Sequence, residues 1–227
     1  MTTPSLLHPQ SWLSDQPDAF AAALHEIGVT KDLSAGTPLY MSEETGGIFG
    51  ILQGCIEIDI AFACSPLSAL HFAYPGYFLG TRPFTTGVGY AVSTKARLDS
   101  QVVEFRLQDL HVLVAKNPEW WKPLSNLTSY WFDVATCSAV DLLLRDPEVR
   151  CIAVLLRLGG YRPFEHIDAQ PRTIPVTHNE LAENSNLSRS RLSETLANLE
   201  AAGHIRRGYR DIEVLRPASL ARMIEFG

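Results

Sequence analysis

The sequence has few cysteines, and their spacing excludes the commonest uses of this residue. Four occur among 227 residues, and no two stand in C-x-x-C spacing, from which zinc and iron–sulfur sites are commonly built. We therefore expect buried, reduced thiols, with a redox-sensing thiol as the alternative. The four are Cys55, Cys64, Cys137 and Cys151.

Patterns that carry catalysis are also missing. The seven histidines include no H-x-H pair, which argues against the metal site of a jelly-roll metalloenzyme. No glycine-rich phosphate loop, nucleophile elbow or pair of catalytic carboxylates stands out. We therefore expect no catalytic residue, no metal site and no cofactor.

Long apolar runs are absent as well. No uninterrupted run is long enough to span a bilayer, and the first residues lack the basic-then-apolar order of a signal peptide. These absences predict a cytoplasmic protein without a membrane partner.

The chain also lacks a net positive charge, since it carries a formal charge of −6. The excess is confined to residues 1–145, with 8 Lys or Arg against 14 Asp or Glu, whereas residues 146–227 hold 11 of each. A local arginine cluster can dominate at contact even in an acidic protein. The net charge therefore does not exclude a nucleic-acid partner for the C-terminal part. We expect the affinity for that partner to be modest and to depend clearly on salt concentration.

One stretch near the C-terminus, residues 176–215, carries helix start and stop signals in close succession. Thr177 and Glu180 have the spacing of a capping box, and Ser188 is a second N-cap. Between them, Asn186 tolerates the left-handed backbone of a turn. The second helix has Leu192, Leu196 and Leu199 on one face and Gly203 at its end, and Ile205, Ile212 and Val214 flank a turn. This order predicts a winged helix-turn-helix.

The exposed positions of this stretch are rich in arginine. Arg189 and Arg191 open the second helix, and the hairpin adds Arg206, Arg207 and Arg210. Guanidinium groups bind phosphates and guanine edges, and a helix N-terminus offers free N–H groups to a phosphate. The pattern favours a recognition helix in the major groove of double-stranded DNA, with the wing on the backbone. The alternative is a solvated arginine-rich face on a small helical domain.

The stretch resembles the C-terminal domain of the Crp/Fnr family of bacterial transcription regulators. That family carries T-x-x-E-L-A and then S-R-E-T-V-S-R, and this chain has Thr177-His-Asn-Glu-Leu-Ala182 and Ser188-Arg-Ser-Arg-Leu-Ser-Glu194. Arg189 matches the family, whereas Asn186 replaces the turn glycine, Ser190 the glutamate that accepts from a cytosine, and Glu194 the second arginine. The resemblance implies DNA binding, but not the usual target sequence of the family.

These residues define the predicted DNA contacts. We expect Arg189 to read a base, and Ser190 and Glu194 to set the sequence preference, with Arg191 on the same exposed face. The candidates for phosphate contacts are Thr177, His178, Ser188, Arg206 and Arg207.

Residues 33–106 consist of short apolar runs separated by Gly, Pro, Ser and Thr. Strand-length runs occur at 48–53, 56–61, 70–74, 91–96 and 101–105. Many short strands with regular turn signals predict an antiparallel barrel or jelly roll. The runs on either side of Gly54 predict a hairpin, with Glu57 and Asp59 on its solvent face.

This region resembles the sensor domain of the same family, a β-roll related to cyclic-nucleotide-binding domains. The matching landmarks are Gly36-x-x-Leu39-Tyr40, Ile51-Leu52-Gln53-Gly54 and Pro75-Gly-Tyr-Phe-Leu-Gly80. Cyclic-nucleotide binders follow the last glycine with a glutamate for the ribose, and later with an Arg-Ser pair for the phosphate. At equal spacing this chain has Thr81, Tyr90 and Ala91.

A cyclic phosphate needs a cation and hydrogen-bond donors, which these residues do not supply. We therefore expect no binding of cyclic AMP in the usual way of the family. Two alternatives stay open at Gly80, Thr81, Tyr90 and Ala91. One is a less anionic effector in a pocket lined by Phe84, Val88 and Tyr90, and the other is a filled barrel interior.

A long helix is predicted to follow the β-roll. Asn117 and Pro118 suit its start, and Asp146-Pro147 begins the next helix. A stripe near heptad spacing runs through Leu124, Leu127, Trp131 and Val134, then less regularly through Ser138 and Asp141. In the resembling family this helix pairs with its twin. The stripe packs either on a second copy or on the β-roll of its own chain. The helix can also make both contacts at once, one on each of two opposite faces.

The sequence thus predicts an α+β protein with three functional parts. Residues 1–117 form a β-roll sensor with N-terminal helices, 118–145 a dimerisation helix, and 146–227 a winged helix-turn-helix DNA-binding domain. The predicted function is a homodimeric transcription regulator, with half-sites about one DNA turn apart. Its partners are double-stranded DNA, a second copy, an unidentified effector if one exists, and RNA polymerase if it activates transcription. The alternative is a ligand-binding or protein-interaction module with a degenerate helix-turn-helix, and a jelly-roll enzyme is a third class.

Overall fold

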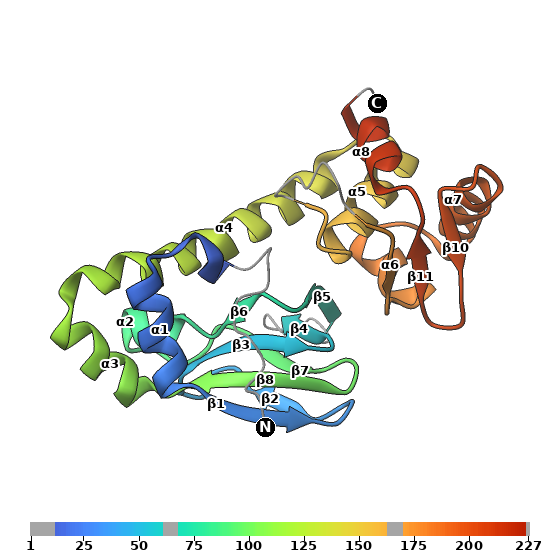
Figure 1. Ribbon diagram of the computed structural model, residues 1–227. Coiled ribbons are helices and arrows are strands. Elements are labelled where there is room, and N and C mark those ends of the chain that lie inside the picture. The colour runs from blue at the N-terminus through green and yellow to red at the C-terminus, as the bar shows by residue number, and fades with distance from the viewer. Residues whose placement is uncertain (1–11, 61–67, 163–169, 226–227) are drawn as a thin grey trace. The chain divides into compact units, whose positions relative to one another are not determined.

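The computed structural model describes residues 12–60, 68–162 and 170–225 (Figure 1). The chain divides into two compact units, residues 1–131 and 132–227. The division falls inside one long helix, α4 (Trp121–Leu143). Among the described residues, no helix is both long enough and apolar enough to cross a membrane. The fold is α+β, as the sequence predicted.

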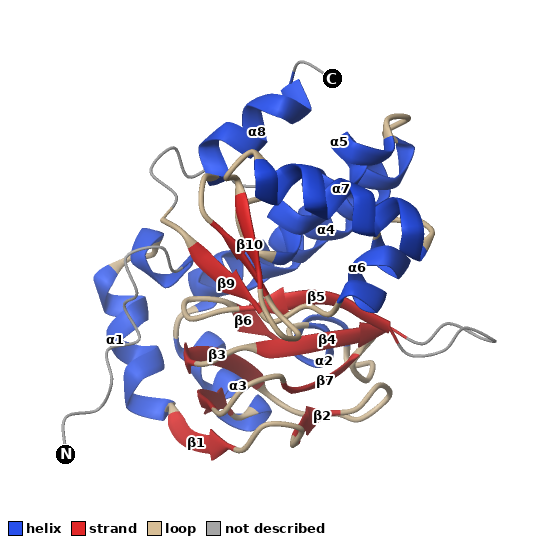
Figure 2. Ribbon diagram, turned by 90° about the vertical axis from the view of Figure 1, so that its right-hand side faces the viewer, coloured by secondary structure: helices blue, strands red, loops and turns tan. Residues whose placement is uncertain are grey.

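The first unit is built on two antiparallel four-stranded sheets (Figure 2). One has the order β1-β8-β3-β6, with β1 (Val29–Leu33), β8 (Ser100–Phe105), β3 (Ile48–Gln53) and β6 (Phe78–Leu79). The other has the order β2-β7-β4-β5, with β2 (Pro38–Tyr40), β7 (Ser93–Ala96), β4 (Ile56–Ile60) and β5 (Ser68–Ala73). Except for β4 and β5, neighbouring strands come from distant parts of the chain, as in the predicted jelly roll.

Short helices complete the first unit. They are η1 (Trp12–Asp15), α1 (Asp18–Ile27), α2 (Arg82–Thr86), α3 (Leu107–Lys116) and η2 (Pro118–Trp120), and η2 leads directly into α4. Pro118 starts this turn as predicted, but the side chain of Asn117 makes no capping hydrogen bond. Leu124 and Leu127 of α4 belong to a core cluster with Phe20, Phe78 and Phe105.

The predicted hairpin around Gly54 is wrong. β3 pairs with β8 and β6, while β4 pairs with β5 and β7, so the two runs lie in different sheets. Gly54 has a φ of +88°, which suits a turn but does not decide what the next strand pairs with. The Ser100 hydroxyl accepts from the Cys55 N–H (3.0 Å) and thereby holds the start of β4 on β8 as the chain changes sheet.

The solvent-facing placement of Glu57 and Asp59 is also wrong, because these side chains are only 3% and 5% exposed. The Lys95 ammonium lies 2.8 Å from Glu57 and 2.9 Å from Asp59, and Arg97 lies 2.8 Å from Glu57. Alternation along the strand was right, since Ile56 and Ile58 are core residues. The second face is buried as well, and ion pairs compensate the carboxylates there.

The second unit joins the rest of α4 to a helical domain with a small sheet. Its helices are α5 (Pro147–Leu158), α6 (His178–Asn184), α7 (Arg189–Ala201) and α8 (Pro217–Glu225). Its antiparallel sheet has the order β10-β11-β9, from β10 (Ile205–Arg207), β11 (Ile212–Val214) and β9 (Arg172–Ile174). The sequence predicted the start of α5, both helices of the helix-turn-helix and the two wing strands to within a few residues.

Candidate nucleic-acid interface

Local side-chain caps define the two helices of the helix-turn-helix. The Thr177 hydroxyl accepts from the Glu180 N–H (3.2 Å), and the Glu180 carboxylate accepts from the Thr177 N–H (2.7 Å), so the predicted capping box is present. Ser188 caps α7 by accepting from the Arg191 N–H (3.3 Å). Between them, Asn186 has a φ of +50°, the left-handed conformation expected for the residue that replaces the turn glycine.

The far end of α7 is closed by a glycine motif. The Gly203 N–H donates to the Glu200 carbonyl (2.9 Å) and the His204 N–H to the Leu199 carbonyl (3.0 Å), which together form a Schellman motif. Gly203 has a φ of +71°. The chain therefore leaves α7 in a fixed direction and enters β10 of the wing.

One face of α7 is anchored and the other is open. Leu192, Leu196 and Leu199 are buried, as their spacing predicted. Arg189, the first residue of α7, is exposed and makes no hydrogen bond or ion pair to any residue in the described part of the chain. Its guanidinium is available to a ligand at the helix N-terminus.

The other predicted residues of α7 and α6 have partners nearby. Arg191 lies 2.8 Å from the exposed Glu194 carboxylate, so the glutamate in place of the second family arginine forms an ion pair on the same face. The Ser190 hydroxyl lies 3.1 Å from that of Ser188. His178 is exposed at the start of α6, whereas Thr177 is half-buried in its capping box.

The wing arginines are tied to carboxylates. Arg206 of β10 pairs with Glu213 of β11. Arg207 donates from Nε (2.7 Å) and from its backbone N–H (2.8 Å) to Glu200 of α7, and these hydrogen bonds lower the pKa of Glu200. Arg207 therefore links the end of the recognition helix to the wing.

The sequence analysis missed Arg150, an arginine that orients the helix-turn-helix. Arg150 of α5 donates from Nε to the Ser185 carbonyl and from Nη1 to the Leu144 carbonyl, both at 2.7 Å. It joins the turn of the helix-turn-helix to the C-terminal end of α4. No local pattern marks such a residue, because both acceptors are backbone carbonyls and one of them lies 35 residues away.

Aromatic side chains occupy the position where the effector was expected. Tyr90 is buried, stacks on Tyr40 with ring centroids 3.9 Å apart, and donates its hydroxyl to the Gly47 carbonyl (2.8 Å). A Cβ on Gly80 (φ +86°) would lie 3.0 Å from the Tyr90 ring. Thr81 is buried and Ala91 is exposed. The structure thus brings Gly80 and Tyr90 together, with side chains occupying the space between the strands.

The described cysteines are buried. Cys55, Cys137 and Cys151 form no disulfide with one another, and burial raises the pKa of Cys151 to about 12. Cys64 lies outside the described residues. Within the described ranges, no group of three or more His, Cys, Asp or Glu side chains is placed to hold a metal ion.

Comparison with known families agrees with this geometry. The family profile described as a Crp-like helix-turn-helix domain matches residues 149–223. The matched region runs from α5 to α8 and includes α7 and the wing, which carry the arginines predicted to contact DNA. No curated protein matches the chain significantly.

Solved structures extend the likeness to the rest of the fold. A CRP/FNR-family transcriptional regulator from Thermus thermophilus is 22% identical, with a TM-score of 0.63, and the match covers 87% of this chain and 98% of that one. FixK2 from Bradyrhizobium japonicum is 15% identical with a TM-score of 0.70, covering 86% and 96%. The c-di-GMP-responsive regulator CLP from Xanthomonas campestris is 16% identical with a TM-score of 0.64, covering 88% and 99%. The second unit thus matches a Crp-like helix-turn-helix profile, and the fold is similar to that of solved CRP/FNR-family regulators.

Proposed function

We propose that the protein is a sequence-specific regulator of transcription that binds double-stranded DNA as a homodimer and does not respond to cyclic AMP. The observation that carries DNA binding is the open N-terminal end of α7, where Arg189 projects without a partner among the described residues. A guanidinium there suits the O6 and N7 acceptors of a guanine. Ser188 and the backbone N–H groups after it suit a phosphate.

The proposal divides the work along the chain. Residues 1–117 sense a signal, 118–145 dimerise, and 146–227 bind DNA, with the hinge near residue 145. A signal would shift the balance between DNA-competent and incompetent arrangements. If the protein activates transcription, RNA polymerase is a further partner. The proposed location of the protein is the cytoplasm.

Replacing Arg189 by alanine is expected to weaken binding by about 1–3 kcal/mol and to relax specificity at one base position. The test selects duplexes from a random library with the wild-type protein, sequences them, and repeats the selection with Arg189→Ala. The variant should lose the preference at one position of each half-site.

Arg222→Ala is the matched control, since it removes an exposed guanidinium from α8 of the same domain, outside the predicted DNA contacts. We expect it to keep the selected sequence. If the Arg189→Ala protein selects the same sequence with the same affinity as wild type, Arg189 does not read a base.

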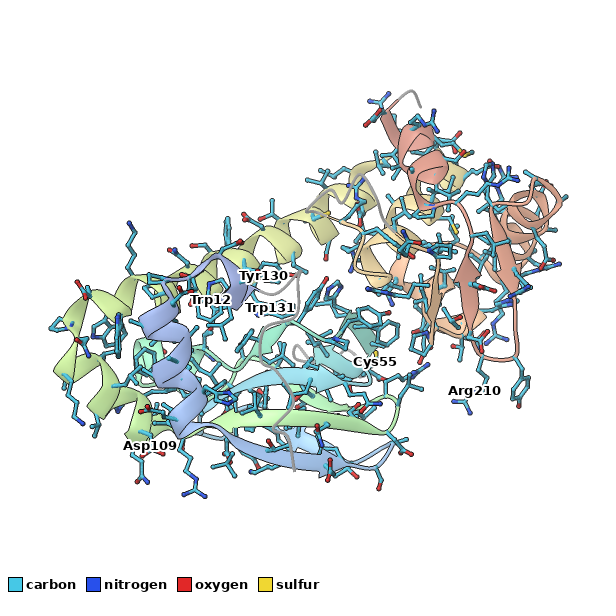
Figure 3. All side chains as sticks on the ribbon, viewed as in Figure 1. Trp12, Cys55, Asp109, Tyr130, Trp131 and Arg210 are labelled. Atoms are coloured by element: carbon cyan, nitrogen blue, oxygen red, sulfur yellow. The ribbon has the colours of Figure 1, made fainter. Side chains whose placement is uncertain are left out.

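The dimer contact is proposed on a face of α4 that the sequence stripe did not mark. The first part of the predicted stripe packs on its own β-roll: Leu124 and Leu127 lie in its core, and the Trp131 Nε1–H donates to the Phe78 carbonyl (2.7 Å; Figure 3). A second heptad stripe is exposed, and Phe132 on it is 70% exposed. This seam consists of Phe132, Ala135, Ala139 and Leu142, with Leu143, 78% exposed, at its edge. Apolar residues in water at such spacing fit a coiled-coil contact with a second copy, where the two alanines allow close approach.

Cyclic AMP is expected not to bind, because Tyr90 and Tyr40 occupy the space and no cation lies among Gly80, Thr81, Tyr90 and Ala91. A ligand at about 100 times its Kd would stabilise the protein by ~2.7 kcal/mol. Millimolar cyclic AMP should therefore leave the melting temperature unchanged, and calorimetry should detect no heat of binding. Micromolar binding in the calorimeter would contradict this expectation.

A ligand-binding or protein-interaction module with a degenerate helix-turn-helix is the second candidate. The ion pairs of Arg191, Arg206 and Arg207 favour it, since they reduce the positive charge that the domain offers to DNA. The random-library selection separates the two candidates, because this module would enrich no duplex.

A further inference from the structure

A cavity of about 470 Å³ opens on the first unit, where the end of β8 leads into α3. It is bounded by Gly46 and Gly47 of the loop before β3, by Glu104 of β8 and by the first turn of α3. Asp109, labelled in Figure 3, marks this end of α3 and lies outside the lining. Pockets of roughly 300–1,000 Å³ hold small molecules, so the cavity is large enough for one.

Three hydrogen-bond donors line the α3 side of this cavity. Arg106 immediately precedes α3, and Gln108 and His111 lie three residues apart on one face of the helix. All three residues are exposed, and their side chains make no hydrogen bond or ion pair to any residue of the described ranges. The His111 ring is positioned by stacking on Phe84, with centroids 5.3 Å apart. The cavity therefore presents a guanidinium, an amide and an oriented imidazole that no polar contact within the fold uses.

Glu104 supplies an acceptor in the same cavity. Its carboxylate lies 2.7 Å from the Lys31 ammonium, and this ion pair reduces the repulsion that a bound anion would meet. A carboxylate has about four lone-pair sites, so Glu104 can still accept a hydrogen bond from a hydroxyl. The cavity thus combines donors for an anionic group with an acceptor for a neutral one.

The glycine loop connects the cavity to the interior of the β-roll. A Cβ on Gly47 would overlap the Phe105 carbonyl oxygen, so the loop closes against β8 only with glycine there. The Tyr90 hydroxyl donates to the Gly47 carbonyl (2.8 Å), and a Cβ on Gly46 would overlap that hydroxyl. The loop that bounds the cavity is therefore held by Tyr90, the side chain that occupies the expected effector position.

We propose that this cavity binds a small phosphate monoester that also carries hydroxyl groups, the chemistry of a sugar phosphate, and that it is the effector site of the sensor unit. Arg106, Gln108 and His111 donate to the terminal oxygens of the phosphate, for which the fork of a guanidinium is well suited. Glu104 accepts from a hydroxyl of the same molecule. The effector role rests on the proposed function, whereas the binding itself does not.

The test is calorimetry on the full-length protein with ribose 5-phosphate, glucose 6-phosphate and glycerol 3-phosphate, and with inorganic phosphate for comparison. At least one ester should bind, roughly tenfold more tightly than inorganic phosphate, because only the ester has a hydroxyl for Glu104. Arg106→Ala should weaken that binding roughly 10- to 100-fold, the effect of losing hydrogen bonds to a charged group. Its melting temperature should equal that of wild type, since the exposed side chain has no partner among the described residues.

Lys116→Ala is the matched control, because it removes an exposed cation from the other end of α3. It should bind the ester as wild type does. Any of three results overturns the site: no ester binds at concentrations up to about 10 mM, inorganic phosphate binds as tightly as the best ester, or Arg106→Ala binds that ester with wild-type affinity.

The effector role has a separate readout. At constant ionic strength, saturating ester should change the affinity of wild type for a duplex enriched from the random library by roughly 5- to 150-fold. The DNA affinity of Arg106→Ala should stay the same at that ester concentration. If the ester binds wild type but leaves its DNA affinity unchanged, the effector role is wrong. If wild type enriches no duplex, the proposed function fails, and calorimetry still decides whether the cavity binds the ester.

Discussion

Replacing Phe132 by glutamate is expected to convert the protein to a monomer. Phe132 is 70% exposed on the seam of α4, and burying such a ring against a partner contributes roughly 1.5–3 kcal/mol. In a two-fold dimer the change occurs twice. The dimer should therefore weaken by about 10²- to 10⁴-fold, since each 1.4 kcal/mol is a factor of ten. Sedimentation equilibrium over a range of protein concentrations measures this directly.

The same variant should lose most of its DNA affinity, because two linked domains bind two half-sites far more tightly than one domain binds one. Asn126→Glu is the control: it adds the same charge to an exposed position of α4 on another side of the heptad. It should stay dimeric. If Phe132→Glu is also dimeric at micromolar concentration, the seam lies elsewhere.

Replacing Asp141 by alanine is expected to destabilise the second unit by about 3–5 kcal/mol. Asp141 of α4 is fully buried and accepts from the Nε of the buried Arg157 (2.8 Å) and from Nη2 of Arg162 (3.1 Å). Without the carboxylate, the buried Arg157 guanidinium loses its ion pair with Asp141 and stays in the interior. Such a loss exceeds the effect of removing a surface ion pair, which is ~0–1 kcal/mol.

The position of the tryptophans allows this effect to be assigned to one unit. All four, Trp12, Trp120, Trp121 and Trp131, lie in the first unit, so their fluorescence follows that unit during urea unfolding. Far-ultraviolet circular dichroism follows the helices of both. In Asp141→Ala the circular dichroism midpoint should fall much further than the fluorescence midpoint. Asp133 is an exposed aspartate on the same helix, and Asp133→Ala should shift neither the circular dichroism midpoint nor the fluorescence midpoint. If Asp141→Ala and Asp133→Ala have the same circular dichroism midpoint, Asp141 has no structural role.

The helix-turn-helix was predictable almost to the residue, because its signals act over a few positions. The hydroxyls of Thr177 and Ser188 cap helices that begin one residue later. Gly203 ends α7, where the N–H groups of Gly203 and His204 donate to carbonyls three and five residues before them. The left-handed turn at Asn186 depends on that residue alone. Each of these choices is made before any tertiary contact forms.

The errors concern pairing between distant segments. The runs around Gly54 have the lengths and alternation of a hairpin, yet β3 takes β8 as its partner, about 50 residues further along the chain. On α4, the marked stripe and the exposed seam are both apolar enough for a dimer. Only the packing of Leu124, Leu127 and Trp131 on the β-roll shows which one is already occupied.

By itself, the amino-acid sequence determined the two helices and the wing strands of the helix-turn-helix, the ends of α7 and the arginine at its start, because these depend on neighbours a few residues apart. Tertiary structure alone decided which charged side chains form ion pairs within the protein. Arg206 and Arg207 meet Glu213 and Glu200, and Asp141 meets Arg157, whereas Arg189 and Arg210 meet no described side chain. A charge is available to a ligand only when no opposite charge lies within a few ångströms, and that distance is set by how the chain packs in three dimensions.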